Sequence, residues 1–363
     1  MRLGLYGLPC AGKSFILKQI KCVQVIEGSS TMKGMFPEFD AVDEDRKYDI
    51  RRKFSRWLFS EEDFIMDGHY AFGDHVVFTE VDGELYDVFL YLYIEPGILR
   101  KRIQESEKNR KYAQLNIEEW QRFEIEQLRR YCHENEKDFF VLDNPSMGYF
   151  EDVKEVVEFI KAVQDGYSCV KYAKSCAASI LQNELEQTRI TLSDGDKTIT
   201  AKDTCNVIYG YITSIFDNNF YTGYQAWRHR KNYLENYVSK HGHFSSTDIL
   251  KMKLNDFVVD KLDAHSYILT SGDWGIWEKI AKRLNISCFY GSQMSADTKY
   301  FVAKFLHQAG KHIVAYGDGM NDYYMLREAD EGYLVVKPDG SVSSSIRNMD
   351  LGGISIVQTR ENR

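Results

Sequence analysis

The chain of 363 residues contains no CxxC pair, although it has seven cysteines, an odd number scattered along its length. That distribution excludes a disulfide scaffold and a cysteine-based zinc site, and it predicts reduced thiols in a cytoplasmic protein. No run of about 18 apolar residues occurs, so no membrane-spanning helix is expected. The first residues also lack the cleavage-site pattern of a secretory signal peptide, which supports the same cytoplasmic expectation.

Neither an internal repeat nor a low-complexity tract is present, and hydrophobic (44%) and charged (28%) residues occur in ordinary globular proportions. A disordered or collagen-like chain is thereby excluded. At about 150 residues per domain, the length predicts two domains. Positive charge is scarce in residues 1–165, which hold 23 Lys and Arg against 32 Asp and Glu. This acidic half is a poor match for a long nucleic acid, because such binding depends on basic side chains at phosphates.

Short apolar runs alternate with amphipathic stretches along the whole chain, and this alternation predicts parallel sheets covered by helices. The expected strands of the first half are 3–6, 23–27, 64–67, 88–94 and 139–142, with helices at 13–20, 118–131 and 151–163. The expected strands of the second half are 189–193, 266–270, 286–290, 312–316 and 332–336.

The predicted fold class is therefore α/β, with two doubly wound parallel-sheet domains. We place the first domain at residues 1–165, a helical connector at 166–187 and the second domain at 188–363. The aromatic-rich stretch 202–263 interrupts the second series directly after its first strand. An insertion of that size at that point predicts a helical cap over the site.

A glycine-rich loop at residues 7–14 (GLPCAGKS) has the P-loop spacing GxxxxGK[ST] and lies between an expected strand and an expected helix. Gly7 and Gly12 let backbone N–H groups converge on a phosphate. Lys13 would reach the β- and γ-phosphates of ATP, and the Ser14 hydroxyl would bind Mg²⁺. The motif predicts an ATP site.

Two further features belong to this predicted site. Asp67 ends an apolar strand, so its carboxylate is expected beside the phosphate loop, where it would order Mg²⁺ or orient the acceptor. Basic side chains follow the strand 88–94, and Arg102 and Arg110 are the candidates to close over the transferring phosphates.

These features resemble the small P-loop kinases, the group that contains nucleoside-monophosphate kinases and polynucleotide 5′-kinases, over about residues 1–165. The resemblance implies that the acceptor and its general base lie near the second strand, where Glu27, Asp40 and Asp43 are the candidates for the base. Residues 43–46 (DEDR) also have the D-x-x-R spacing of polynucleotide kinases. The identity of the acceptor stays open.

The second half carries four motif pieces in a fixed order. Residues 194–198 (DGDKT) follow the first expected strand, Thr270 and Ser271 follow the second, Lys299 opens an amphipathic stretch, and residues 317–322 (GDGMND) follow a further strand. These pieces resemble the haloacid-dehalogenase (HAD) phosphatases over about residues 189–340. The DxDKT form with a following cap is similar to their phosphoserine-phosphatase branch.

Hydrolysis of a phosphomonoester through a covalent intermediate needs a carboxylate nucleophile, a metal and a proton donor. Asp194 would attack phosphorus, and Asp196 would protonate the leaving group and then activate water. Asp318 would complete an Mg²⁺ site with Asp194 and the backbone carbonyl of Asp196, since hard oxygen ligands suit that ion.

The remaining pieces would bind phosphate. Ser271, or its neighbour Thr270, would donate to the phosphoryl oxygens, and Lys299 would hold the phosphate and the nucleophile together. Asp322 would brace Lys299 or the metal shell. In the expected cap, Arg228, Arg230 and Lys231 are candidates to contact an anionic leaving group.

The leading hypothesis is a bifunctional enzyme, an ATP-dependent kinase joined to an Mg²⁺-dependent phosphomonoesterase, acting on small phosphorylated metabolites or nucleotides. One alternative is a polynucleotide 5′-kinase and 3′-phosphatase that repairs nucleic-acid ends, which the domain order and the D-x-x-R spacing favour. Another is a phosphatase whose first half senses ATP without phosphorylating an acceptor. No membrane partner is expected.

Overall fold

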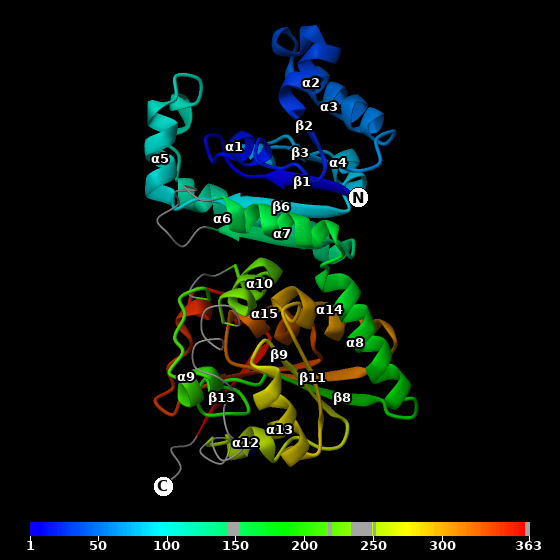
Figure 1. The fold of residues 1–363 in the computed structure, drawn as a ribbon, viewed down its shortest axis with the longest axis vertical. Coiled ribbons are helices and arrows are strands. Elements are labelled where there is room, and N and C mark those ends of the chain that lie inside the picture. Colours follow the sequence, from blue (N-terminus) through cyan, green and yellow to red (C-terminus); the bar gives the residue numbers. More distant parts are fainter. Residues whose placement is uncertain (144–152, 217–219, 234–248, 250–251, 360–363) are drawn as a thin grey trace. The chain divides into compact units, whose positions relative to one another are not determined.

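The computed structural model describes residues 1–143, 153–216, 220–233, 249 and 252–359. They form two compact units, Met1–Tyr167 and Ser168–Arg363 (Figure 1). Both units are α/β, and each is built on one parallel sheet, of five strands in the first and six in the second. Among the described residues, no helix combines the length and the apolar character that crossing a bilayer requires.

The described residues of the first unit form sixteen elements in chain order. They are β1 (Arg2–Tyr6), α1 (Lys13–Leu17), β2 (Gln24–Ile26), α2 (Gly28–Met35), a 3₁₀ turn (Pro37–Ala41), α3 (Glu44–Leu58), β3 (Phe64–Asp67), β4 (Ala71–Phe72), β5 (His75–Val76), α4 (Glu80–Leu85), β6 (Val88–Tyr93), α5 (Pro96–Glu105), a 3₁₀ turn (Arg110–Tyr112), α6 (Ile117–Glu134), β7 (Asp138–Asp143) and α7 (Lys154–Gln164).

The sheet of this unit has the order β2-β3-β1-β6-β7. The first strand lies in the middle, so the chain winds first to one side of β1 and then to the other, and right-handed crossovers place helices on both faces. All five predicted strands are confirmed, with ends that differ by at most one residue. The strand order reverses between β1 and β6, and ligands of such sheets bind beyond the carboxyl ends of the strands at this point.

The second unit contains, in chain order, α8 (Cys169–Asn183), β8 (Arg189–Ser193), α9 (Thr204–Tyr209), α10 (Gly223–Asn232), α12 (Asp256–Val259), β9 (Ser266–Thr270), α13 (Trp274–Leu284), β10 (Ser287–Tyr290), α14 (Ala296–Gln308), β11 (His312–Gly317), α15 (Met320–Glu328), β12 (Glu331–Val336), a 3₁₀ turn (Ser344–Ile346) and β13 (Ile354–Gln358).

Its sheet has the order β10-β9-β8-β11-β12-β13, with all neighbours parallel. Again the first strand, β8, is central, and the order reverses between β8 and β11. The five predicted strands are confirmed, and the sixth, β13, is an edge strand that the sequence analysis did not predict. Each unit is thus a doubly wound parallel sheet, as the sequence predicts.

The segment 166–187, which the sequence predicts as a helical connector, contains α8. One face of α8 is buried in the apolar core of the second unit, through Val170, Ala173 and Ile180. Cys169 at its start lies against the loop before α14, with its Sγ 3.3 Å from the hydroxyl of Ser295. The helix therefore contributes to the packing of the second unit.

The stretch 202–263, the expected cap, leaves the sheet after β8 and returns before β9. Its two ends are paired with each other: the N–H of Ala201 donates to the carbonyl of Lys253, and that of Asn255 to the carbonyl of Ile199. Within it the structure describes α9, α10 and α12, whereas residues 217–219, 234–248 and 250–251 lie outside the described residues.

One ionisable side chain in the core of the first unit is Glu124, on α6, which has no solvent exposure. Its Oε1 accepts hydrogen bonds from the N–H of Ala71 (3.0 Å) and from Nε1 of Trp120 (3.2 Å), whereas its Oε2 has no hydrogen-bond partner. Burial raises the pKa of this carboxyl from 4.5 to about 7.

Glu124→Gln is expected to raise the free energy of unfolding of the first unit, relative to the unaltered chain, more at pH 8 than at pH 5. Between pH 4.5 and about 7 the unfolded carboxyl ionises before the folded one, so the free energy of unfolding falls as pH rises. Glutamine removes this loss, worth up to about 3 kcal/mol. Amide hydrogen exchange in β6 and β7 at the two pH values reports on this unit alone. An effect of Glu124→Gln that is equal at pH 5 and pH 8 would contradict the expectation.

Candidate active sites

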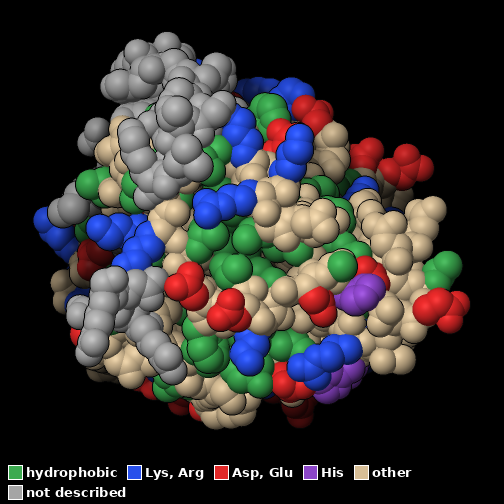
Figure 2. Space-filling model, turned by 90° about the horizontal axis from the view of Figure 1, so that it is seen from below, with side chains coloured by type: hydrophobic (Ala, Val, Ile, Leu, Met, Phe, Trp, Pro, Cys, Tyr) green, Lys and Arg blue, Asp and Glu red, His purple; other side chains and the backbone are tan. Residues whose placement is uncertain are grey.

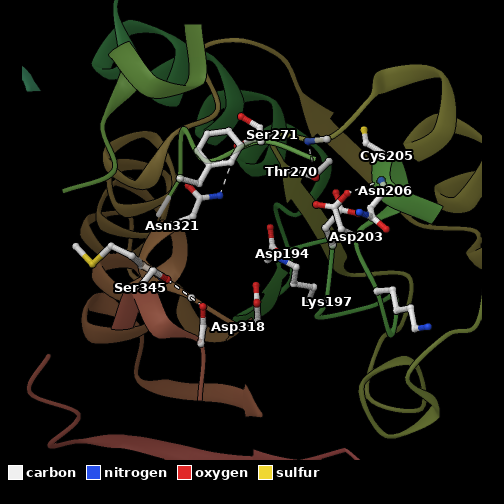
Figure 3. Close-up of a pocket in the computed structure, with 18 of the residues that line it drawn as sticks. Asp194, Lys197, Asp203, Cys205, Asn206, Thr270, Ser271, Asp318, Asn321 and Ser345 are labelled. Carbon is white, nitrogen blue, oxygen red and sulfur yellow. Dashed lines mark hydrogen bonds between the residues drawn. The ribbon is translucent and has the colours of Figure 1, made fainter. Parts of the chain in front are cut away.

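Three adjacent strands of the second sheet end in polar residues at one edge. Asp194 follows β8, Ser271 follows β9 and Asp318 follows β11. Parallel strands place their carboxyl ends on the same side, so these residues, far apart in the sequence, meet around one cavity (Figure 3). The sequence predicts this group of residues, and the structure brings its members together.

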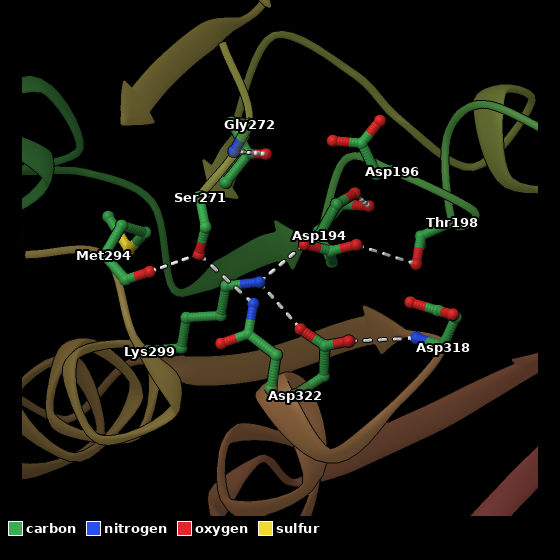
Figure 4. A network of polar contacts seen from close by, with 12 residues as sticks. Asp194, Asp196, Thr198, Ser271, Gly272, Met294, Lys299, Asp318 and Asp322 are labelled. Carbon is green, nitrogen blue, oxygen red and sulfur yellow. Dashed lines mark hydrogen bonds and ion pairs between the residues drawn. The ribbon is translucent and has the colours of Figure 1, made fainter. Parts of the chain in front are cut away.

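Lys299 lies beneath this edge, on the first turn of α14, with no solvent exposure. Its Nζ is 2.5 Å from Oδ1 of Asp194 and 2.7 Å from Oδ1 of Asp322, which comes from α15 (Figure 4). The other oxygen of Asp322 accepts the N–H groups of Asp318 (3.0 Å) and Gly319 (3.3 Å). One ammonium thus joins the nucleophile candidate to the loop that carries Asp318.

The approach of α15 to β11 depends on a glycine. A Cβ on Gly317 would lie 2.2 Å from the Cβ of Asp322, closer than atoms can pack. The small residue therefore lets the Asp322 carboxylate reach Lys299. Sequence reasoning includes Gly317 in the motif but gives no reason for it; the close contact supplies one.

Electrostatics in this site follow from burial and from the crowding of carboxylates. Burial, and next the Asp322 carboxylate, raises the pKa of Asp194 to about 6. Burial, with the charge of Asp194, raises the pKa of Asp318 well above its usual value. Burial alone would lower the pKa of Lys299, but the two carboxylates that it contacts outweigh this and raise it. A buried lysine thus stays charged.

Asp196 is held in place by two donors. The N–H of Thr204 donates to its Oδ1 (2.6 Å), and Nε1 of Trp277 donates to its Oδ2 (3.2 Å). Burial, and then the nearby charge of Asp203, raises the pKa of Asp196 to about 7. The carboxyl is therefore oriented and can hold a proton near neutral pH. Sequence reasoning missed Trp277, because nothing local marks a residue that approaches from a distant helix, here α13.

The two hydroxyls that the sequence leaves as alternatives differ in their partners. Oγ1 of Thr270 accepts the N–H of Gly272 (3.0 Å) and so stabilises the turn after β9. The Ser271 hydroxyl accepts from the hydroxyl of Tyr221 (3.2 Å) and the side-chain amide of Asn321 (3.4 Å), and it donates to the carbonyl of Met294. Ser271 lies at the centre of a polar network, whereas Thr270 supports the turn.

The donor set fits a hard divalent cation. Asp194, Asp318 and Asp322 each offer a carboxylate oxygen, and these atoms all lie within 4.8 Å of one another. Carboxylates at this spacing, without nitrogen or sulfur ligands, match the preference of Mg²⁺. The predicted contribution of Asp196 is its backbone carbonyl, which stays a prediction, and its side-chain carboxylate is held by Thr204 and Trp277.

The P-loop of the first unit runs from β1 into α1. Gly7 and Gly12 have φ angles of +143° and +102°, which favour glycine, and a Cβ at Gly12 would meet nothing within 4 Å. The loop is therefore open on the side of Gly12. The Nζ of Lys13 binds the loop carbonyls of Gly7 (2.5 Å) and Leu8 (3.2 Å). Burial lowers the pKa of Lys13 to about 8.

A cavity of about 850 Å³ adjoins this loop. Lys13, Ser14 and Asp67 line it, as the sequence predicts for one site. Asp67 comes from β3, next to β1 in the sheet, and its Oδ1 accepts the N–H of Gly28 (3.1 Å). The loop, the hydroxyl and the carboxylate thus face one space that is large enough for a nucleotide.

The three candidate bases differ in their positions. Asp40 lines the cavity and forms an ion pair with Lys33 (2.6 Å), whereas neither Glu27 nor Asp43 is among its described lining residues. Asp43 caps α3, since its Oδ1 accepts the N–H of Arg46 (2.8 Å). The D-x-x-R spacing therefore coincides with a helix N-cap, a function that any Asp at this position performs.

The basic segment after α5 also contributes to this cavity, but with residues other than those predicted. Lys108 and Lys111 line it, whereas Arg102 and Arg110 are not among its described lining residues. Nε of Arg110 instead donates to the carbonyl of Gln104 (3.0 Å). The sequence shows a basic run here but cannot show which of its side chains face inward.

No family model matches the chain, and no curated protein matches it. Among solved structures, shikimate kinase from Bacteroides thetaiotaomicron is 16% identical, over 46% of this chain and 98% of that one (TM-score 0.32). The shikimate kinase of Acinetobacter baumannii is 13% identical, over 46% and 95% (TM-score 0.34). A HAD family hydrolase from Salmonella enterica serovar Typhi is 15% identical, over 48% and 68% (TM-score 0.32). Likenesses this weak carry no argument about activity.

Lys299→Met is expected to lower the free energy of unfolding of the second unit by about 3–5 kcal/mol, because Asp194 and Asp322 would be left as buried carboxylates without their counter-charge. Urea unfolding at pH 7, followed by hydrogen exchange in β8 and β11, measures it. Lys282→Met, an exposed lysine at the end of α13, serves as the control and should change stability by less than about 0.5 kcal/mol. Equal effects of the two substitutions would contradict the expectation.

Proposed function

We propose that the second unit hydrolyses phosphomonoesters through a phosphoryl group held covalently on Asp194. The observation that supports this most is the fully buried Lys299, which contacts both Asp194 and Asp322 at the edge of three parallel strands. Burying a cation and two carboxylates costs desolvation energy, so such an arrangement is weak evidence for a role in stability alone. Binding a phosphate dianion next to a carboxylate nucleophile is a function that would require it.

In the proposed reaction, a carboxylate oxygen of Asp194 attacks phosphorus, and the bond from phosphorus to the ester oxygen breaks. Asp196 donates its proton to the leaving oxygen, for which its raised pKa and its two fixed hydrogen bonds suit it. Asp196 then takes a proton from water as the water attacks phosphorus. Inorganic phosphate leaves, and both carboxyl groups return to their starting states.

The other residues bind and orient. Ser271 and Lys299 would hold the phosphoryl oxygens, and Asp194, Asp318 and Asp322 are the residues that would hold Mg²⁺. When bound, that ion offsets the negative charge of the phosphate and the carboxylates. Asp322 also positions Lys299 and the loop that carries Asp318.

Asp194→Asn is expected to reduce phosphate release by at least about 10³-fold, because an amide is not a nucleophile toward phosphorus. Release from phosphoserine, glycerol phosphate, mononucleotides and 3′-phosphorylated oligonucleotides is measured with and without Mg²⁺. Chelation of Mg²⁺ should abolish the activity of the unaltered chain. Lys13→Ala, in the other unit, is the matched control and should retain full phosphatase activity. Phosphate release that survives Asp194→Asn would contradict the proposal.

We also propose that the first unit transfers the γ-phosphoryl group of ATP to an acceptor hydroxyl. The support is the cavity on which Lys13, Ser14 and Asp67 converge. Lys13 would leave the loop carbonyls to bind the phosphates, and Ser14 would hold Mg²⁺. Asp67 would orient the acceptor or the water around the ion, and Lys108 and Lys111 would bind phosphate oxygens.

Lys13→Ala is expected to lower phosphoryl transfer by about 10²-fold or more, since its ammonium would no longer stabilise the transferring phosphate. Transfer of labelled phosphate from ATP to nucleosides, nucleotides, small alcohols and 5′-hydroxyl oligonucleotides is best measured in chains carrying Asp194→Asn, so that the second unit cannot remove the label. ATP that binds without labelling any acceptor would indicate the nucleotide-sensing alternative instead.

The alternative of nucleic-acid end repair predicts that activity falls steeply as salt rises, because strand binding releases counterions. On the face in Figure 2, the described basic and acidic side chains are interspersed around an apolar centre, an arrangement unlike the basic stripe that follows a phosphate backbone. The excess of acidic over basic residues in 1–165 also favours small phosphorylated substrates. The two substrate panels above, repeated at low and high salt, separate the two hypotheses.

A further inference from the structure

The cavity above Asp194 has a volume of about 520 Å³, which is room for more than a phosphate group. Its floor holds the polar residues of the proposed reaction. Ser343, Ser344 and Ser345 line it from the segment after β12. The stretch 202–263 lines the cavity with polar and charged residues near its start, such as Lys202 and Asp203, and with a group of rings further along.

Four rings, which we call the aromatic wall, line the cavity from that stretch: Tyr211, Phe216, Tyr221 and His229. The ring of Phe216 is 4.8 Å from those of Tyr221 and His229, with its plane inclined to them by 53° and 64°. Tyr211 extends the group, 5.6 Å from His229. Rings inclined in this way present faces as well as edges to a group that enters the cavity.

The four rings of the aromatic wall carry no formal charge near pH 7, whereas Lys202 and Asp203, earlier in the same stretch, are the charged residues that it adds to the lining. Burial lowers the pKa of His229 to about 4, so its ring is neutral near pH 7. Arg228, Arg230 and Lys231, predicted to contact an anionic leaving group, are not among the described lining residues. Arg228 and Lys231 instead lie over the rings of Tyr224 and Trp227, both at 5.3 Å.

The aromatic wall begins next to the phosphate-binding residues. The hydroxyl of Tyr221 donates to the hydroxyl of Ser271 (3.2 Å), which would hold the phosphoryl oxygens. A leaving group bound there would therefore meet the rings as soon as it extends beyond the ester oxygen. Charged groups such as an ammonium and a carboxylate would lose their hydration against such a wall, whereas a planar ring would stack on it.

From this geometry we propose that the second unit selects phosphomonoesters whose leaving alcohol carries a planar ring, such as a nucleoside, and discriminates against amino-acid and polyol phosphates. The inference rests on the proposed phosphatase function and specifies its substrate class. It assigns a function to the aromatic wall, which is to stack on the leaving group.

The test compares four esters of primary alcohols, whose leaving groups have similar reactivity. Adenosine 5′-monophosphate and benzyl phosphate carry a ring, and glycerol phosphate and phosphoserine do not. Chains carrying Lys13→Ala are used, so that the first unit does not bind the nucleotide. We expect kcat/KM to be at least about tenfold higher for the two ring-bearing esters. Equal values, or a preference for phosphoserine, would overturn the inference while leaving the phosphatase itself established.

Variants of Phe216 assign the preference to the aromatic wall. Phe216→Ala should lower kcat/KM for benzyl phosphate by about tenfold and that for glycerol phosphate by less than twofold. Phe216→Trp should restore the preference, whereas Phe216→Leu, which keeps bulk without a plane, should not. Phe257→Ala removes an exposed ring of the same stretch outside the cavity and is the matched control. An equal loss on both esters in Phe216→Ala would overturn the inference.

Binding gives a readout that does not depend on turnover. In chains carrying both Lys13→Ala and Asp194→Asn, calorimetric titration should give a dissociation constant for benzyl phosphate about tenfold below that for glycerol phosphate. If no ester is hydrolysed by the active chain, the proposed function fails, and this titration still decides the inference. Equal dissociation constants would overturn it.

Discussion

The contact of Lys299 with Asp194 and Asp322 is the interaction on which the second unit depends. It joins the end of β8 to α14 and α15, and through Asp322 it fixes the loop that carries Asp318. Because all three side chains are buried, the charges cannot be relieved by water, and each needs the others. The same contact therefore determines both how α14 and α15 pack against the sheet and how the residues of the site are arranged.

In the first unit, the charged side chains of the site are paired with backbone groups and not with one another. Lys13 is held by loop carbonyls, and Asp67 by the N–H of Gly28, so both charges have neutral backbone partners. A ligand that carries its own charges could replace these partners. In the second unit Lys299 already offsets part of the charge of Asp194 and Asp322, and a ligand must fit beside this contact.

The strands and the main group of site residues could be predicted from sequence, because each is marked by a short local pattern. Apolar runs predicted ten strands, and the order of the motifs predicted that Asp194, Ser271 and Asp318 meet at one edge. Contacts across the fold could not be predicted. The hydrogen bonds from Trp277 to Asp196 and from Tyr221 to Ser271 join residues about 80 and 50 positions apart. The edge strand β13 was missed because its exposed positions, such as Ile356, break the expected alternation. The roles of the individual site residues stay predictions until the variants are measured.

The central position of β8 also has a consequence during synthesis on the ribosome. Asp194 is made 105 residues before Lys299 and still longer before Asp322, so the growing chain carries this carboxylate without its counter-charge for most of the time in which this unit is translated. Domains generally fold as units as they emerge. The second sheet therefore cannot close its polar centre until α15 has left the exit tunnel, whereas Asp67 follows Lys13 early enough for the first site to form while the second is still being made.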